Sequence, residues 1–472
     1  MSADSRPNIL LILTDQQRGD CLGLAGHPVL QTPRLDNIGA EGCYFPHAYS
    51  AHPQCIPARR TLLTGKTAHG HGVYTNYNTT LDAPTLPGEL TKAGYHTHLC
   101  GKLHLWPQRK LYGFMSADWS DAPHVGMTGD YLPWLHAQGI TMPQAGMAHG
   151  ANQNGWVARP FHLPEQYHFT NWVTDRAMNF LERRDPTVPF FLNVSYHQPH
   201  QPCTPPQVYW DRYINADLPE PVIGDWVDEA PYEPGLPVAS WKTVLRKPEM
   251  RQFRAGYYGC INHIDDQIGR LLSVLPGNTV VIFTSDHGEM LGDHQWIRKT
   301  RGFESSARVP WVMKFPNNLG LPSRSRRDEV VELMDIMPTC LDLAGAPIPE
   351  GVEGRSLIPR LRGEGDWREW LHGEAANCGG EATGMQFLTD GHWKYIWEPG
   401  AGREYWFDLQ QDPDECHNLA KDPAHQEAIE ACRQRLAGIL DGRPEGFVQE
   451  GQLVKLKGAT RGCVPELDRA SH

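Results

Sequence analysis

Three short apolar runs along the chain each end in polar residues. Residues 8–14 (NILLILT) lead into Asp15, residues 189–195 (PFFLNVS) lead into a His-rich cluster, and residues 279–285 (TVVIFTS) lead into Asp286. An unbroken apolar run of this length is typical of a strand that is buried on both faces, as in a parallel sheet. Functional sites of open α/β sheets lie at the carboxyl ends of the strands. The pattern therefore predicts three buried strands whose ends converge on candidate site loops.

Stretches with helical periodicity separate and follow these runs, at residues 170–183, 250–275 and 327–343. Strands that alternate with helices predict an α/β fold, in which a large, mostly parallel sheet is sandwiched by helices. Residues 105–165 and 200–248 are dense in Pro and lack periodicity. We expect long loops there, lying over the site.

The pattern changes after about residue 360. Short alternating segments are followed by one helical stretch, near residues 383–388, 393–398, 404–408 and 424–440. Alternation with a period of two is typical of half-buried strands, so a small antiparallel sheet with one helix is expected. We therefore predict an α/β domain that carries the site at residues 1–362 and a C-terminal α+β subdomain with a tail at residues 363–472.

The amino-acid composition limits the classes of protein to which this chain can belong. The 472 residues are 40% hydrophobic and 21% charged, as in a soluble globular protein, and no apolar run reaches the length of about 18 residues that could cross a membrane. The net charge of −12 and the lack of a long Lys or Arg run give no support to a nucleic-acid surface. The N-terminus offers only a short apolar run without a basic leader, so we expect no signal peptide and, for the eleven cysteines, reduced thiols in the cytoplasm.

The segment around Cys55 carries the most specific chemical signal. It reads CIPAR at residues 55–59, a CxPxR pattern, and continues with RTLLTG at residues 60–65. Alone, such a cysteine is most often a packed thiol at the start of a helix. Six further blocks follow a fixed order and change that interpretation: PNILLILTD at 7–15, GYHTHLCGKLHL at 94–105, FFLNVSYHQPHQP at 190–202, TSDHGEMLGDH at 284–294, KTRGFESSARVP at 299–310 and WFDLQQDPDECHNLA at 406–420.

Together these motifs resemble the type I sulfatases of the alkaline-phosphatase superfamily, over nearly the whole chain. The resemblance implies an alkaline-phosphatase-like fold and a sulfuric ester hydrolase that releases an alcohol and inorganic sulfate. It also implies that a formylglycine-generating enzyme converts Cys55 to Cα-formylglycine. In that chemistry one hydroxyl of the hydrated aldehyde attacks sulfur, and the other later expels sulfate by re-forming the aldehyde.

The resemblance also assigns roles to individual residues. It implies one divalent metal ion, for which we expect Ca²⁺ first and Mg²⁺ or Mn²⁺ second, because hard cations prefer oxygen ligands. The implied metal ligands are Asp15, Gln16, Cys55, Asp286 and His287. The implied catalytic residues are Cys55, Arg59, Lys102, His104, His200 and Lys299, and the implied substrate contacts are Asn76, Lys102, His200 and Lys299.

The residue types suit these roles. Lys102 and Lys299 are compact point charges that fit the sulfuryl oxygens. His104 could take a proton from the hydrate, and on an extended segment its spacing from Lys102 would put both side chains on one face. His200 matches the histidine that protonates the leaving oxygen, with His197 as its competitor. Asn76 lies in a weak motif that a structural turn explains nearly as well.

Gln16 departs from the family pattern, in which many members carry Asp at this position. Gln16 and His287 together point toward the related phosphonate monoester and phosphodiester hydrolases, whereas Lys102 and His104 favour sulfatases. We therefore expect sulfate monoester hydrolysis, with phosphonate monoester or phosphodiester hydrolysis, or promiscuity for both, as the alternative. Two further alternatives are a binding protein that has lost the chemistry and a metal-only phosphatase with unmodified Cys55.

The substrate class stays open among aryl, alkyl and sugar sulfates of small size. Aromatic and imidazole side chains in the first Pro-rich stretch would suit a ring-bearing or sugar substrate, although packing accounts for half or more of them: Trp106, Trp119, His124, Trp134, His149 and Trp156. Surface loops and the tail at residues 448–457 leave room for a homo-oligomer.

Overall fold

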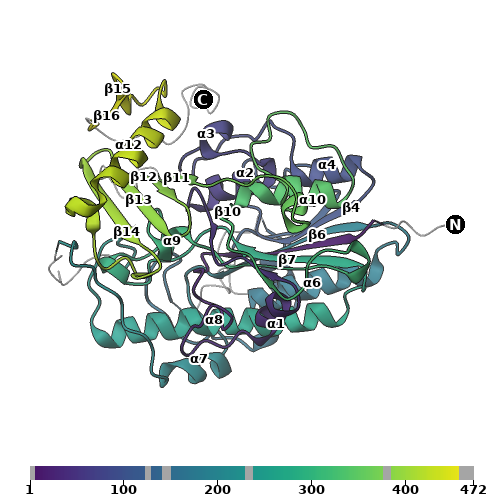
Figure 1. Ribbon diagram of the computed structural model, residues 1–472. Coiled ribbons are helices and arrows are strands. Elements are labelled where there is room, and N and C mark those ends of the chain that lie inside the picture. The colour runs from purple at the N-terminus through teal and green to yellow at the C-terminus, as the bar shows by residue number, and fades with distance from the viewer. Residues whose placement is uncertain (1–5, 123–128, 141–149, 229–237, 376–383, 457–472) are drawn as a thin grey trace.

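The computed structural model describes residues 6–122, 129–140, 150–228, 238–375 and 384–456, which are arranged around two main sheets (Figure 1). The larger sheet has eight strands in the order β5-β4-β6-β1-β7-β8-β2-β9. Their bounds are β5 Ser116–Trp119, β4 His96–Gly101, β6 Phe190–Pro199, β1 Asn8–Asp15, β7 Thr279–Ser285, β8 Trp311–Lys314, β2 Cys43–Tyr44 and β9 Ser325–Arg326.

The centre of this sheet is parallel, as the apolar runs predict. β1 pairs in parallel with β6 on one side and β7 on the other, and β4 pairs in parallel with β5 and β6. β8 runs antiparallel to both β7 and β2. The expected α/β fold with a mostly parallel sheet is confirmed, with an antiparallel strand near one edge.

Helices cover both faces of the sheet because successive residues of β1 point to opposite sides. Ile9 and Leu11 pack with one set of helices, α2 Cys55–Thr64, α4 Leu86–Lys92, α10 Ile336–Leu343 and α11 Leu357–Leu361. Leu10 and Ile12 pack with the other set, α1 Pro33–Glu41, α5 Tyr131–Ala137, α6 Phe169–Arg183 and α8 Lys247–Ser273. Figure 1 shows α2, α4 and α10 above the sheet and α1, α6 and α8 below it.

The second sheet forms the C-terminal unit, at the upper left of Figure 1. Its four strands are antiparallel in the order β11-β12-β13-β14. Their bounds are β11 Leu371–Ala375, β12 Met385–Thr389, β13 Trp393–Glu398 and β14 Arg403–Asp408. Helix α12, Gln426–Leu440, packs on one face of this sheet, and β15 Val448–Gln449 pairs with β16 Gln452–Leu453 beyond it. The expected antiparallel sheet with one helix is confirmed, and the domain boundary at residue 362 stays a prediction.

Three details differ from the sequence expectation. The helix expected at residues 327–343 begins only at Ile336, because β10 Val331–Glu332 pairs with β3 Ala48–Tyr49 and the side chains of Glu332 and Asp335 form a capping box. The expected loops contain β5, α5 and α7 Gln207–Ile214, and strand β11 was not expected. The expected strand start at residue 383 and the end of the tail at residue 457 lie outside the described residues.

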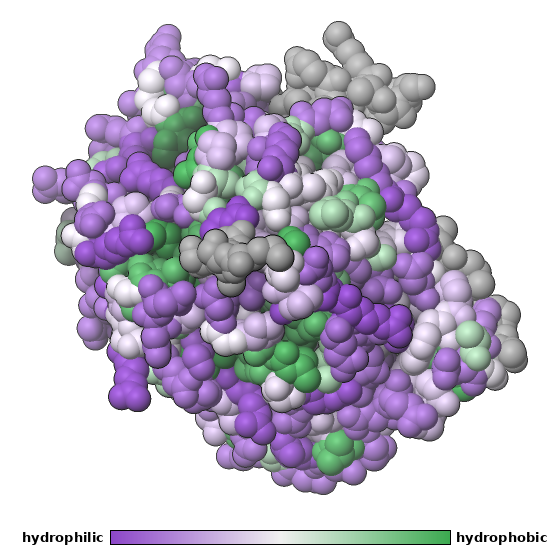
Figure 2. Space-filling model, turned by 90° about the vertical axis from the view of Figure 1, so that its right-hand side faces the viewer, coloured by the Kyte–Doolittle hydropathy of each residue, from purple (hydrophilic) through white to green (hydrophobic). Residues whose placement is uncertain are grey.

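The short elements that complete the described chain are helices α3 Ala68–His71 and α9 Glu304–Ala307 and several single 3₁₀ turns. Within the described ranges, none of the helices combines the length and the apolar character that a membrane span needs. The nine cysteines in those ranges are free thiols. On the face shown in Figure 2, hydrophobic residues gather in several small patches that hydrophilic residues separate.

Candidate active site

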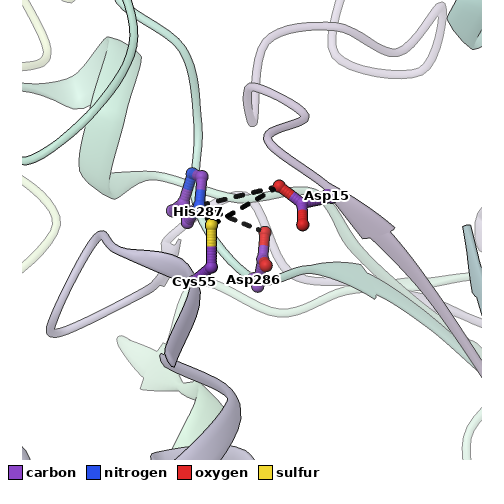
Figure 3. A group of neighbouring side chains, drawn as sticks. All are labelled: Asp15, Cys55, Asp286 and His287. Atoms are coloured by element: carbon purple, nitrogen blue, oxygen red, sulfur yellow. Dashed lines mark hydrogen bonds and ion pairs between the residues drawn. The ribbon is translucent and has the colours of Figure 1, made fainter. Parts of the chain in front are cut away.

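Four potential metal ligands meet where β1, β7 and α2 come together (Figure 3). Asp15 is the last residue of β1, Asp286 and His287 directly follow β7, and Cys55 is the first residue of α2. All four are buried, and their ligand atoms lie within 4.8 Å of one another. Cys55 Sγ lies 3.3 Å from His287 Nε2 and 3.8 Å from Asp15 Oδ1. The prediction that the strand ends converge on one site is confirmed.

Strand register explains why the carboxylates are neighbours. Thr14 of β1 lies beside Ser285 of β7, so the next residues of both strands emerge at the same edge of the sheet. The N–H of Gln16 then donates to Asp286 Oδ1 at 3.0 Å and fixes that side chain. His287 is followed by Gly288, where a Cβ would lie 2.1 Å from the carbonyl oxygen of Ser305, so only glycine fits.

Helix α2 presents Cys55 because the chain is extended at Gln54 and turns helical at the next residue. Pro57 is tolerated within the first turn, where backbone N–H groups have no partner inside the helix. One of these groups, the N–H of Ile56, donates to Asn76 Oδ1 at 2.9 Å. The positive end of the helix dipole therefore points at Cys55, where it favours negative charge.

Arg59 lies one turn later on α2 and joins the carboxylates. Its guanidinium donates to Asp286 Oδ2 at 2.9 Å and to Asp15 Oδ2 at 3.3 Å. It also donates to Ser195 Oγ at 2.9 Å and to the carbonyl oxygen of Lys102 at 3.0 Å. Arg59 thus holds the carboxylates of Asp15 and Asp286 and the backbone that carries Lys102.

Two buried lysines reach the same point from different segments. Lys299 Nζ donates to Cys55 Sγ at 3.1 Å and to Gln16 Oε1 at 2.6 Å. Lys102 Nζ is paired with Asp15 Oδ2, and it follows Gly101, whose φ of 98° and tight fit against Ser195 exclude a side chain. The structure therefore brings together both lysines that the sequence predicts.

The surrounding charges change the ionisation of the site. Burial opposes ionisation of the Cys55 thiol, but Lys299 and Lys102 outweigh it and hold the pKa of this thiol well below its ordinary value. Burial likewise disfavours the Asp15 carboxylate, yet Lys102 helps to keep the pKa of Asp15 well below its usual range. The pKa of Asp286 is raised by burial and by Asp15. An anion at position 55 is therefore stabilised, and a cation between the two carboxylates would favour ionisation of both.

The donor set fits a divalent cation. Two carboxylates supply hard oxygen ligands, and His287 adds a nitrogen, with its Nε2 at 3.5 Å from Asp286 Oδ1. His287 Nδ1 lies 3.0 Å from the carbonyl oxygen of Gly288, which leaves Nε2 to face the other donors. Gln16 lies next to this group, with Oε1 on Lys299 and Nε2 on Gln201 and Glu289. Its role as a metal ligand stays a prediction.

His104 lines the site in a geometry that differs from the expected one. Its φ is 57°, so the segment turns after Lys102 and is not extended. The N–H groups of Leu103 and His104 both donate to Asp121 Oδ1, at 3.0 and 2.7 Å, and this carboxylate holds the turn. Lys102 and His104 nevertheless both border the same cavity.

His200 and His197 are neighbours, with ring centroids 4.9 Å apart, and both border the cavity. His200 Nδ1 lies 2.8 Å from the carbonyl oxygen of Gln201, and His197 Nε2 lies 3.2 Å from the same oxygen. Burial, reinforced by Lys299, lowers the pKa of His200 to about 4. Because a carbonyl only accepts, His200 Nδ1 carries its proton, and Nε2 can donate only in the protonated ring.

The site opens into a cavity of about 360 Å³. Its walls combine side chains that the sequence motifs predict with others, most of which belong to the Pro-rich stretches. The unpredicted lining residues are Gln54, Asn78, Leu105, Gln108, Asp121, Ala122, Gln153, Asn154, Trp241 and Arg298. Trp241 and Arg298 stack with the guanidinium carbon 3.8 Å from the ring centroid. Adjacency to Lys299 is the one sequence signal that could have identified Arg298.

The aromatic residues of the first Pro-rich stretch serve different purposes. Trp106 borders the cavity and is 44% exposed, so it can contact a substrate. Trp119, Trp134 and Trp156 pack in or against hydrophobic clusters. The two histidines of this set, at positions 124 and 149, lie outside the described residues.

Comparisons with known proteins agree with this geometry. The family model for sulfatases matches residues 7–346, and a model for the C-terminal part of N-sulphoglucosamine sulphohydrolase matches residues 292–441. The chain is 40% identical to an arylsulfatase of Clostridium perfringens, over 95% of this chain and 98% of that protein. It is 30% identical to the multifunctional alkaline phosphatase superfamily protein PehA of Trinickia caryophylli, over 91% of this chain and 94% of that one.

Solved structures share the fold. The phosphonate monoester hydrolase of Agrobacterium radiobacter matches with a TM-score of 0.78 at 24% identity, over 96% of this chain and 100% of that one. A complex titled BT4656 with D-glucosamine-2-N,6-O-disulfate matches with a TM-score of 0.75 at 23% identity, over 93% and 99% of the two chains. Because the family model covers most of the chain and the donors of the motif meet at one point, this chain belongs to the sulfatase family.

Proposed function

We propose that this protein hydrolyses sulfate monoesters to an alcohol and inorganic sulfate, with Cys55 converted to formylglycine as the nucleophile. The observation that carries the proposal is the position of Cys55. It lies at the start of α2 and borders the cavity, with Lys299 Nζ at 3.1 Å and His287 Nε2 at 3.3 Å. A nucleophile at this point borders the cavity and lies beside the positive charge of Lys299.

The hydrated aldehyde of formylglycine supplies the hydroxyl that attacks sulfur and the second hydroxyl that expels sulfate. A divalent cation held by Asp15, Asp286, His287 and position 55, with Gln16 beside them, would lower the pKa of that hydroxyl. We propose Ca²⁺ first, with Mg²⁺ or Mn²⁺ as alternatives, because carboxylate oxygens lead the donor set. Metal analysis of the purified protein tests this order.

The lysines supply the electrostatic part of the chemistry. A sulfuryl group that enters from the cavity would meet the ammonium groups of Lys102 and Lys299, both of which border it. In this buried environment, preorganised positive charge stabilises the negative charge that accumulates on the sulfuryl oxygens. Arg59 contributes by holding both carboxylates and the Lys102 backbone in place.

We assign the proton transfers to His104 and His200. We assign to His104, which borders the cavity together with Lys102, the acceptance of the proton released when sulfate is expelled. We assign protonation of the departing alkoxide oxygen to His200, with His197 as the neighbouring alternative. Since burial and Lys299 lower the pKa of His200 to about 4, this role requires that the bound substrate's negative charge favours the protonated ring.

Hydrolysis of phosphonate monoesters or phosphodiesters is the second candidate. It is favoured by Gln16 beside the metal donors and by the 30% identity to PehA, a multifunctional member of the superfamily. A sulfate monoester and a phosphate diester both present a tetrahedral centre with one negative charge, so one site can accept both. Lys102 and His104 at the cavity favour sulfate as the main substrate.

The experiment compares a sulfate monoester with a phosphodiester that has the same leaving group. The protein is produced together with a formylglycine-generating enzyme, and mass spectrometry of the Cys55 peptide verifies the conversion. We expect faster turnover of the sulfate ester and loss of turnover in Cys55→Ala. A diester rate that is higher by orders of magnitude would contradict the proposal. A panel of aryl, alkyl and sugar sulfates then identifies the substrate class.

A further inference from the structure

Glu289 is a buried carboxylate behind the site that no part of the proposed chemistry uses. It is 0% exposed and lies two residues after His287. Its Oε2 accepts from the amide nitrogens of Gln16 and Gln201, the latter at 2.8 Å. Its Oε1 accepts from the backbone N–H of Leu291 at 2.9 Å and from that of Arg298. A buried carboxylate that receives four donors is a fixed hub and not a solvated charge.

The hub connects three segments that each carry a site residue. Gln16 follows Asp15 at the end of β1, Gln201 follows His200 beyond β6, and Arg298 precedes Lys299. Gln201 Oε1 also accepts from Gln16 Nε2 at 2.7 Å, and the backbone carbonyl oxygen of Gln201 lies 2.8 Å from His200 Nδ1. The contacts among Gln16, Gln201 and Glu289 join residues that are far apart in the sequence.

We propose that Glu289 is a positioning residue, which fixes the orientation of the Gln16 amide so that its oxygen faces the metal site. Both oxygens of the Glu289 carboxylate accept from N–H groups, and both neighbouring amides present their nitrogens to it. For Gln16, this leaves Oε1 on the opposite side, where it lies 2.6 Å from Lys299 Nζ. A flipped amide would direct its N–H₂ group toward Lys299 and toward any cation at Asp15 and Asp286.

The test uses Glu289→Gln, which keeps the size of the side chain but removes the acceptor-only group. One of the facing amides can then flip, because Gln offers both a donor and an acceptor. Removing a partner of this kind typically costs tenfold to hundredfold in metal affinity. We expect the metal-free E289Q protein to bind Ca²⁺, added alone and measured by calorimetry, about 10- to 100-fold more weakly than the unaltered protein.

A second background separates orientation from charge. In Gln16→Met the residue at this position has no amide, so E289Q can no longer act through its orientation. We expect E289Q to change the Ca²⁺ affinity of Q16M by no more than about threefold, a coupling that a double-mutant cycle measures. Glu332→Gln, a substitution of another buried carboxylate outside the site, is the matched control and leaves Ca²⁺ affinity unchanged.

The outcomes are distinct. Unchanged Ca²⁺ affinity in E289Q overturns the inference, and so does an equal loss in the Q16M background, which would indicate a charge effect alone. Should E289Q fail to fold, Glu289→Asp takes its place, since it shortens the reach of the carboxylate, and the same two outcomes decide. The inference rests on the proposed metal-dependent function: an unaltered protein that binds no cation and cleaves no sulfate ester contradicts that function instead.

Discussion

Replacing Arg59 by Met tests how the negative charge of the Asp15 and Asp286 carboxylates is balanced. The Arg59 guanidinium is buried and lies 2.9 Å from Asp286 and 3.3 Å from Asp15. At an effective dielectric constant of about 20, each contact corresponds to about 5 kcal/mol of attraction, much of which ion desolvation offsets. Breaking a buried pair while its partner stays costs about 3–5 kcal/mol. We expect R59M to lose about that much unfolding free energy in the metal-free protein.

The assay is urea unfolding of R59M and the unaltered protein, with a chelator and with saturating Ca²⁺. A bound cation would neutralise the negative charge of the two carboxylates in place of Arg59, so R59M should lose less unfolding free energy when Ca²⁺ is present. Arg60→Met is the matched control, because the neighbouring buried guanidinium donates to the carbonyl oxygens of Thr79 and Thr80 at 3.0 and 2.9 Å. Its loss should be equal in both conditions. An R59M loss that does not depend on Ca²⁺ would refute the reasoning.

Three further perturbations follow from the structure. His200→Ala should lower kcat for an alkyl sulfate by about 10²–10⁴-fold but affect a nitrophenyl sulfate much less, because a good leaving group needs no proton; the same pattern in His197→Ala instead would move the acid role to His197. Asn76→Ala should cost about 1 kcal/mol of stability because it removes the acceptor of the Ile56 N–H. Asn76→Asp keeps that acceptor but should slow turnover, because its negative charge repels the sulfate. Equal activity of the two variants would show that Asn76 only caps the helix and does not contact the substrate. Burial opposes ionisation of Glu374, but Arg443 at 2.8 Å lowers the pKa of Glu374 to about 2. The ionised carboxylate therefore stabilises the fold at pH values above the unfolded-state pKa of about 4.5, and this stabilisation is lost as the pH falls toward 2. Glu374→Gln should therefore cost about 3 kcal/mol at pH 7 and progressively less below pH 4.5 in acid unfolding, and a loss independent of pH would contradict this linkage.

Local sequence patterns were sufficient to predict several elements. β7 follows the predicted run of residues 279–285 without a shift, and α6 begins within one residue of its predicted start. The antiparallel β13 also matches its predicted bounds at residues 393–398. These segments are specified by one periodic apolar pattern each. Prediction was wrong at residues 327–335, where pairing of β10 with β3 overrides a helical pattern.

The residues of the candidate site also differ in whether the sequence could predict them. The resemblance to the sulfatase motifs implied that Cys55, Asp15, Asp286 and His287 belong to one site, and the structure brings their donor atoms together. The turn at His104 could not be predicted, since it depends on Asp121, whose carboxylate accepts from two N–H groups 17 and 18 residues earlier in the chain.

The sequence by itself determined the sheet, the converging strand ends and the chemistry of the donors, because these depend on local periodicity and residue type. Only the tertiary structure decided which side chains orient those donors. Glu289 meets Gln16 across 273 residues and Gln201 across 88. Packing between elements decides which residues become such partners, because a buried polar group without a partner would cost free energy. A local sequence pattern holds no information about contacts between distant elements.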